Sequence, residues 1–460
     1  MRSVVPAWDQ PHWPNPGYWV AARLVWEGQP SLAYAPQAVF FQQAARLGTV
    51  RDIFEANAPT TLLVFAPLGG LSEQAAHRFW LLFSLGCFLA AWVTLLWGVR
   101  VPVAGALALS ALVPWFQPWR ENIARGQAYP LVFLLAVAAA VGSLPRGAPR
   151  GRLPTAAGRA LWLAGVACGL LAIVKLYYGL VLVLPLVARR QWTVLAGAGL
   201  VFAAAGLGTI VAWGPGLWAS ALGLSLAWRE RPETAVTAYQ TLNGWLTHLL
   251  RYDAVWNRGP VAQLPALVTP LWWGLALLGG GLTLVVAARA ILPPGATPAR
   301  RLLVPALGIP LALLLVPIAE DYHFLLTLLP LLVAGMVLWE TRAAGPGQDR
   351  VPRRWLRRWG GPLVWAAAIV LLAPPWPFNV PSVGGWHALL YYPRLYGTLL
   401  LWGLVLGLLW PGRARSVIQE QIAREHPAAQ GNEQETDQEE RHLDAGVAHQ
   451  DDRYEHVDGE

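Results

Sequence analysis

The run from Leu161 to Ala188 is long enough to cross a membrane, and its single charged residue, Lys175, is the only lysine of the chain. A span needs about 20 apolar residues, and an ammonium group at the bilayer centre costs about 2.5 to 3.5 kcal/mol on insertion scales. Such a cation occupies a polar cavity, pairs with an anion, or reaches the interface along its flexible side chain. Lys175 is therefore predicted to be a functional residue, with an interfacial residue of no function as the alternative.

The composition predicts an all-α polytopic membrane protein. Hydrophobic residues make up 55% of the 460 residues and charged residues only 13%, which excludes an ordinary soluble domain. The two cysteines lie in apolar runs, so neither a disulfide framework nor a thiolate metal site is indicated. We expect roughly 11 transmembrane helices, near residues 77–98, 101–119, 126–143, 158–174, 176–188, 192–214, 268–290, 302–318, 322–340, 361–375 and 389–410.

The arginines between the apolar runs predict the orientation. Arginines cluster at residues 146–159 and 189–190, on both sides of the Lys175 run, and again at 289–301 and 342–358. The positive-inside rule places all four clusters in the cytoplasm. A short hairpin then brings Lys175 near the extracytoplasmic face. The same face would receive residues 1–75, 120–127, 214–266, 320–323 and 374–387.

This predicted orientation divides the chain into three regions. Residues 1–75 are predicted to be an extracytoplasmic N-terminal loop region, residues 76–412 a transmembrane domain, and residues 413–460 a disordered cytoplasmic tail. From Ser416 to Glu460 the chain carries 13 acidic residues against three arginines and almost no large apolar residue. Such a segment cannot bury enough apolar surface to fold alone.

Short motifs lie mostly at the predicted outer ends of the spans. They are Tyr18 to Leu24 with Gly28, Ala58-Pro59, Ala66-Pro67, Gly126-Gln127, Val174-Lys175-Leu176, Arg189 to Trp192, Gln240 to Gly244 and Tyr322-His323. Their order and side resemble those of glycosyltransferase family 87, which comprises polyprenol-phosphate-mannose-dependent mannosyltransferases and relatives in the GT-C superfamily. The resemblance covers residues 1 to about 410.

The resemblance implies a GT-C-like helix bundle in the plasma (inner) membrane that lacks the usual first helix, through a misplaced start codon or a truncation. It implies the transfer of mannose or another hexose from a polyprenyl-phosphate carrier to an extracytoplasmic glycan or lipid acceptor, usually with inversion. The expected partners are donor, acceptor and membrane lipids, and not nucleic acid. The lipid-linked sugar is a substrate and no cofactor is expected; the metal requirement stays open.

Three residues suit the phosphate side of this reaction. Lys175 can stabilise the departing phosphate, which develops negative charge. Arg125 can grip phosphate oxygens bidentately, and Gln127 adds an amide donor. An interfacial anchor on lipid phosphates is the alternative for Arg125.

The catalytic base is less clear from the sequence. The family resemblance places an aspartate where this chain has Pro14, so Asp9 is the nearest substitute, with Asp52 and Glu55 in reserve. His323 is the second candidate base, because an imidazole beside carboxylates can be oriented for proton transfer.

Two further residues are predicted to bind substrate. Asn243 offers donors and an acceptor next to Gly244, although an Asn-Gly pair is also a common turn signal. Asp321 lies beside His323, with an N-terminal helix cap as the alternative role. Two adjacent carboxylates and one histidine do not define a metal site, so no metal ligand is predicted.

Two alternatives to a transferase remain. The chain could be a non-catalytic or truncated GT-C-like protein that binds or moves lipid-linked sugars, which the Pro14 position favours. An ion-coupled transporter would more naturally carry polar groups through the midplane and show two repeated halves. The sequence has neither a clear internal repeat nor paired intramembrane acids.

Overall fold

The computed structural model describes residues 4–144, 155–290, 292, 295–343, 359–376 and 384–410. These residues belong to the larger of two compact units. Within the described ranges the chain is helical and has no β-strand, as the sequence predicts. The predicted tail at 413–460 lies outside the described residues, as do most of the predicted cytoplasmic arginines at 342–358.

The N-terminal region is built of short helices, although the sequence predicts a loop region. Tyr18 stacks on Phe65 with ring centroids 4.1 Å apart, and Phe54 meets the edge of the Tyr18 ring. These buried rings join segments far apart in the region and belong to the same hydrophobic core as the bundle helices. Its elements are α1 (Val4–Trp8), α2 (Gly17–Trp26), η1 (Pro30–Tyr34), α3 (Gln37–Arg46), α4 (Pro59–Phe65) and η2 (Ala66–Gly70), where η marks a 3₁₀-helix.

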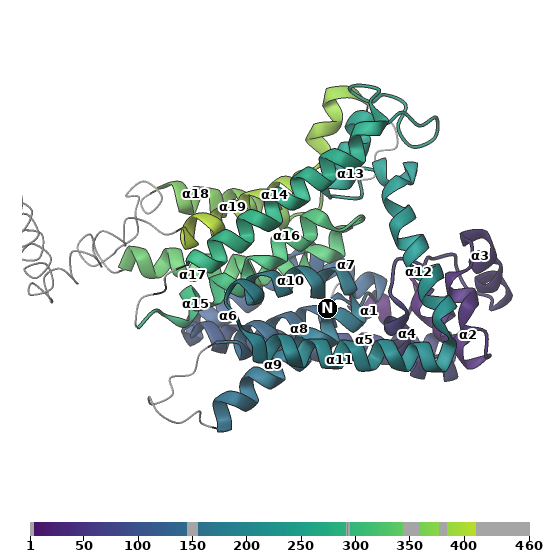
Figure 1. Ribbon diagram of the computed structural model, residues 1–460, viewed down its shortest axis with the longest axis horizontal. Coiled ribbons are helices and arrows are strands. Elements are labelled where there is room, and N and C mark those ends of the chain that lie inside the picture. The colour runs from purple at the N-terminus through teal and green to yellow at the C-terminus, as the bar shows by residue number, and fades with distance from the viewer. Residues whose placement is uncertain are drawn as a thin grey trace, which may run out of the picture. The chain divides into compact units, whose positions relative to one another are not determined.

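Four apolar helices pack side by side in the first half of the bundle: α5 (Glu73–Val99), α8 (Tyr129–Gly142), α9 (Thr155–Val174) and α11 (Trp192–Trp213) (Figure 1). Glycines bring α9 and α11 close together, because a Cβ at Gly165 would lie 2.6 Å from the Val194 carbonyl oxygen. Small residues commonly permit such contacts between membrane helices. The shorter α6 (Val103–Leu112), η3 (Val113–Trp115) and α7 (Gln117–Arg125) connect α5 to α8.

The second half of the bundle packs against the first through α10 (Leu176–Ala188), which contacts α9, α14 and α16. The remaining elements form connections and the C-terminal helices. They are α12 (Pro215–Ala227), η4 (Trp228–Glu230), η5 (Pro232–Ala235), α13 (Leu242–Leu250), η6 (Pro265–Leu267), α14 (Val268–Arg289), α15 (Pro298–Ala306), α16 (Gly308–Leu315), η7 (Asp321–Thr327), α17 (Leu328–Ala343), α18 (Gly361–Leu372), η9 (Gly385–Tyr391) and α19 (Pro393–Leu409).

Helix length and hydropathy support fewer membrane spans than the sequence predicts. Among the described residues, five helical segments are long and apolar enough to cross a membrane: Glu73–Val99, Trp192–Trp213, Pro265–Arg289, Pro298–Leu315 and Asp321–Ala343. A sixth would combine η9 and α19, which are bent by 62°. Other predicted spans coincide with apolar helices of 10–17 residues, so the count of eleven is not confirmed.

The chain breaks its helix at Lys175, which confirms the predicted pair of short helices on either side. Lys175 has an extended backbone (φ −146°, ψ 90°) between α9 and α10. The hydroxyls of Thr60 and Thr61 in α4 donate to the Ile173 and Val174 carbonyls at the end of α9. These bonds satisfy carbonyls that a helix C-terminus leaves without partners and tie the N-terminal region to the break.

Candidate active site

A cavity of about 290 Å³ lies at the Lys175 break. Six segments of the chain meet around it. Its lining residues are Asn15, Tyr18, Asp52, Ile53, Ala56, Asn57, Ala58, Pro59, Gln127, Tyr129, Lys175, Leu176, Tyr177, Tyr178, Leu180, Trp218, Ala221, Leu222, Ser225, Trp228, Val316, Pro317, Ile318, Glu320, Tyr322 and His323.

One wall of the cavity is apolar and reaches the outer surface of the bundle. Trp218, Leu222 and Ser225 recur at helical spacing, so one face of α12 forms this wall. Leu180 of α10 and Leu222 line the cavity and are still 57% and 49% exposed. The cavity therefore opens toward a surface of the kind that lipid would cover.

Lys175 lies in the cavity with a neutral hydrogen-bond partner. Its Nζ donates to Asn57 Oδ1 at 2.6 Å, and Asn57 is held in place because its Nδ2 donates to the Phe54 carbonyl. The ammonium also lies 5.5 Å and 5.4 Å from the ring centroids of Tyr18 and Tyr129. Within the described residues no carboxylate is in ion-pair distance of Nζ, so the cation can take an anionic ligand.

The carboxylate of Asp52 lies at the start of α2. It accepts a hydrogen bond from the Gly17 N–H at 2.8 Å and another from Asn15 Nδ2 at 3.3 Å. A Cβ at Gly17 would lie 2.8 Å from Asp52 Oδ2, so glycine is what permits this approach. Burial raises the pKa of Asp52, and the hydrogen bonds to its charged form oppose that rise.

A second carboxylate in the cavity is neutralised by an arginine. Glu320 Oε2 lies 2.9 Å from Arg125 Nη1, and Arg125 Nε donates to Glu121 at 2.8 Å. Burial raises the pKa of Glu320, and the Arg125 charge opposes that shift. Arg125 is not a lining residue, so its contact with the cavity runs through Glu320.

His323 is oriented by the backbone of Glu320. The Glu320 N–H donates to His323 Nδ1 at 3.1 Å, in a capping box at the start of η7. Nδ1 also lies 3.2 Å from the Glu320 carbonyl oxygen, so the Glu320 backbone holds the ring through Nδ1 in either neutral tautomer.

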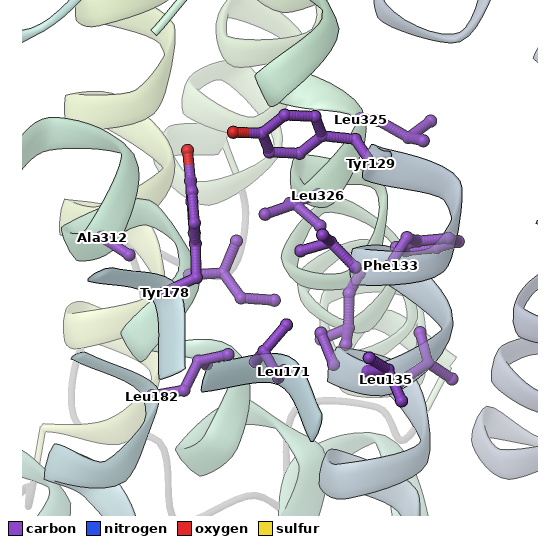
Figure 2. Close-up of a cluster of buried hydrophobic side chains, with 14 of the residues drawn as sticks. Tyr129, Phe133, Leu135, Leu171, Tyr178, Leu182, Ala312, Leu325 and Leu326 are labelled. Carbon is purple, nitrogen blue, oxygen red and sulfur yellow. The ribbon is translucent and has the colours of Figure 1, made fainter. Parts of the chain in front are cut away.

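Two tyrosines separate the polar cavity from the hydrophobic core. Figure 2 shows the hydroxyls of Tyr129 and Tyr178 on one side of a cluster of aliphatic side chains. Leu171 and Leu182 lie beneath them, and both tyrosines line the cavity. The Tyr18 hydroxyl donates to Gln127 Oε1 at 3.3 Å beside this floor.

Four predicted site residues do not line the cavity, and Arg125 is one of them. Asp9 is exposed after α1, and Asp321 pairs with Arg394 at 3.1 Å. Asn243 lies buried in the first turn of α13, where its Nδ2 donates to the Arg229 carbonyl at 3.5 Å. Asn243 therefore lies in a helix rather than in a turn, and its amide bonds to the protein backbone. Glu320, and not Asp321, is the N-cap of η7.

Sequence reasoning held Asp52 only in reserve and did not single out Asn57, Tyr129 or a binding role for Glu320. The adjacent reserve residue Glu55 is buried and pairs with Arg231 at 2.5 Å, so the two loop carboxylates have different surroundings. Within the described ranges, no three His, Cys, Asp or Glu side chains form a group that could hold a metal ion.

The comparison with known families matches the part of the chain that builds most of this cavity. The model of glycosyltransferase family 87 matches residues 56–317, which is more than half of the chain. The chain belongs to glycosyltransferase family 87. Membership makes it a membrane glycosyltransferase, and the matched range includes Gln127 and Lys175. No curated protein and no solved structure matches the chain.

Proposed function

We propose that this family 87 member transfers mannose or another hexose from a polyprenyl-phosphate carrier to a glycan or lipid hydroxyl on the extracytoplasmic side of the plasma membrane. The main support is a single cavity that joins a cation without a carboxylate partner, Lys175, to the exposed apolar rim at Leu180 and Leu222. A ligand that fits both ends has an anionic head and a hydrocarbon tail. A polyprenyl-phosphate sugar has this form.

Lys175 binds the phosphate of the donor in this proposal. As the bond between the anomeric carbon and the phosphate oxygen breaks, that oxygen keeps the electron pair and its negative charge grows. A cation placed at this oxygen stabilises the transition state more than the ground state. Gln127, which lines the same cavity, can add an amide donor to the phosphate.

Asp52 is the base that the geometry favours over Asp9. The acceptor oxygen forms a bond to the anomeric carbon while its proton passes to the Asp52 carboxylate, and the polyprenyl phosphate leaves. Burial raises the pKa of Asp52, which makes its carboxylate a better proton acceptor near neutral pH. Asp9, exposed and outside the cavity lining, has no comparable position.

His323, the other predicted base, serves as a hydrogen-bonding residue in this proposal, because its Nδ1 is already engaged by the Glu320 backbone. Its place in the cavity suits the orientation of a sugar or acceptor hydroxyl. Arg125 has an indirect role, because it positions Glu320 through an ion pair. Asp321 likewise positions Arg394.

The test is turnover by the purified protein with polyprenyl-phosphate mannose and a panel of lipid and glycan acceptors. Wild-type protein should form product, and Lys175→Ala should lose about 10²- to 10³-fold in turnover, the usual loss for one charge-stabilising group. Equal turnover by Lys175→Ala would remove Lys175 from the mechanism. Donor binding without product from any acceptor would favour the non-catalytic alternative.

A further inference from the structure

Arg229 packs against the rings of two tryptophans near the cavity. Its guanidinium carbon is 3.6 Å from the ring centroid of Trp272 and 4.8 Å from that of Trp273, both at the start of α14. Arg229 follows Trp228, a buried residue that lines the cavity. Stacking on indole holds the guanidinium plane and leaves its N–H groups to bind acceptors in that plane.

The other two arginines close to the cavity are neutralised by glutamates. Arg125 pairs with Glu121 and Glu320, and Arg231 pairs with Glu55. Arg229 differs, since among the described residues no carboxylate lies within ion-pair distance of it.

The surroundings of Arg229 favour an anion that comes from outside the chain. Burial lowers the pKa of Arg229, which means that its charge is partly desolvated. An electrostatic interaction with Tyr177, another residue of the cavity lining, opposes that lowering of the pKa. A partly desolvated guanidinium gains most from a bidentate acceptor such as phosphate.

Arg229 itself does not line the cavity, whereas its neighbours Trp228 and Tyr177 do. We propose that Arg229, at the edge of the cavity, is a second binding residue for the polyprenyl phosphate that Lys175 also binds. This inference rests on the proposed function, because it assumes a lipid-linked donor. The donor phosphodiester has one negative charge, and the product phosphomonoester has about 1.5 to 2 near pH 7. A second cation therefore binds the released polyprenyl phosphate more tightly than the donor. Arg229 is accordingly expected to raise the affinity for the product.

The experiment measures binding of polyprenyl phosphate to the full-length protein in detergent, with polyprenol and phosphatidylglycerol as comparison ligands. Arg229→Gln should weaken binding of polyprenyl phosphate about tenfold, the loss expected for one charged hydrogen bond, and leave polyprenol unchanged. Arg229→Lys should recover part of the affinity, because it keeps the charge and loses the planar contact. Arg78→Gln is the matched control, since Arg78 also stacks on an indole, 5.2 Å from the Trp8 ring, away from the cavity lining.

Two results would overturn the proposal. Unchanged affinity of Arg229→Gln for polyprenyl phosphate would remove the residue from the site. A loss confined to phosphatidylglycerol would make Arg229 an anchor for lipid headgroups. Because binding is measured without turnover, these results leave the proposed function intact, whereas wild-type protein that does not bind polyprenyl phosphate contradicts both. If Arg229→Gln does not fold, the Arg229→Lys comparison decides by the same criteria.

Discussion

Lys175 and Arg394 are two cations in the apolar part of the chain with different surroundings. Arg394 is completely buried, and its guanidinium binds both oxygens of Asp321 and the carbonyls of Leu372 and Pro374. Lys175 is partly buried and has a neutral amide as its hydrogen-bond partner. The first arrangement fixes helices to each other, and the second leaves charge available in a cavity.

The difference separates structural charges from functional ones. When a buried ion is paired with a carboxylate and carbonyls, removing one partner strongly destabilises the fold. Such a pair therefore indicates a structural role. An ion that is left with partial compensation at a cavity gains most from a ligand. The same contrast holds in η7, where Asp321 pairs with Arg394 while Glu320 and His323 line the cavity.

Asp52→Asn should have the largest effect, a loss of turnover of about 10²- to 10⁴-fold. Asparagine keeps the shape and cannot accept the proton. Since burial raises the pKa of Asp52, wild-type activity should fall with decreasing pH above the ordinary carboxyl range, because only the deprotonated form is a base. The pH dependence of turnover checks this, and an unchanged acid limb in Asp52→Asn would contradict the assignment.

Asp321→Asn should destabilise the fold by about 3 to 5 kcal/mol, because it leaves the buried Arg394 without its carboxylate. A lowered apparent melting temperature in detergent would report this loss. Glu233→Gln is the control, since Glu233 is 3.9 Å from Arg231 in a partly exposed pair and should change stability by less than about 1 kcal/mol. Equal stability of the two variants would mean that Arg394 is not held for the fold.

Gly17→Ala should lower turnover by about 10²-fold, since small displacements of a reacting group have effects of this size. The new Cβ would meet Asp52 Oδ2 at 2.8 Å and the Ile53 carbonyl oxygen at 2.5 Å, so the carboxylate has to move. Gly199→Ala in α11 is the control, because no atom lies within 4 Å of the Cβ that this substitution would add. Similar turnover in both variants would show that the position of the Asp52 carboxylate does not matter.

Asn57→Asp should give the smallest effect and would make Lys175 resemble Arg394. The carboxylate would pair with Nζ, at 2.6 Å from the present amide oxygen, and compete with the donor phosphate. We expect KM for the donor to rise about tenfold, which corresponds to about 1.4 kcal/mol, with some loss of thermal stability because aspartate cannot donate to the Phe54 carbonyl. Steady-state kinetics with varied donor concentration would show it; an unchanged KM would argue against phosphate at Lys175.

The sequence predicted the parts of the site that depend on local pattern. The all-α class, the break at Lys175 and the presence of Gln127 and His323 in one place follow from apolar runs, arginine clusters and motif order. The position of Asp52 did not follow, because only tertiary packing brings its carboxylate to the Gly17 N–H. The sequence also did not predict that Glu320 and His323 line the cavity while Asp321 pairs with Arg394. This difference depends on 3₁₀ geometry, in which residues three apart lie on one side of the helix.

We propose that Lys175 binds a ligand and that Arg394 stabilises the fold, and one pair of variants separates these roles. Lys175→Met is compared with Arg394→Met by the apparent melting temperature and by turnover with polyprenyl-phosphate mannose. Lys175→Met should lose turnover and keep or raise its melting temperature, because an apolar replacement removes the desolvation cost of the ion, whereas Arg394→Met should lose its fold by leaving Asp321 unpaired. Full turnover by Lys175→Met, or equal destabilisation of both variants, would contradict this division of roles.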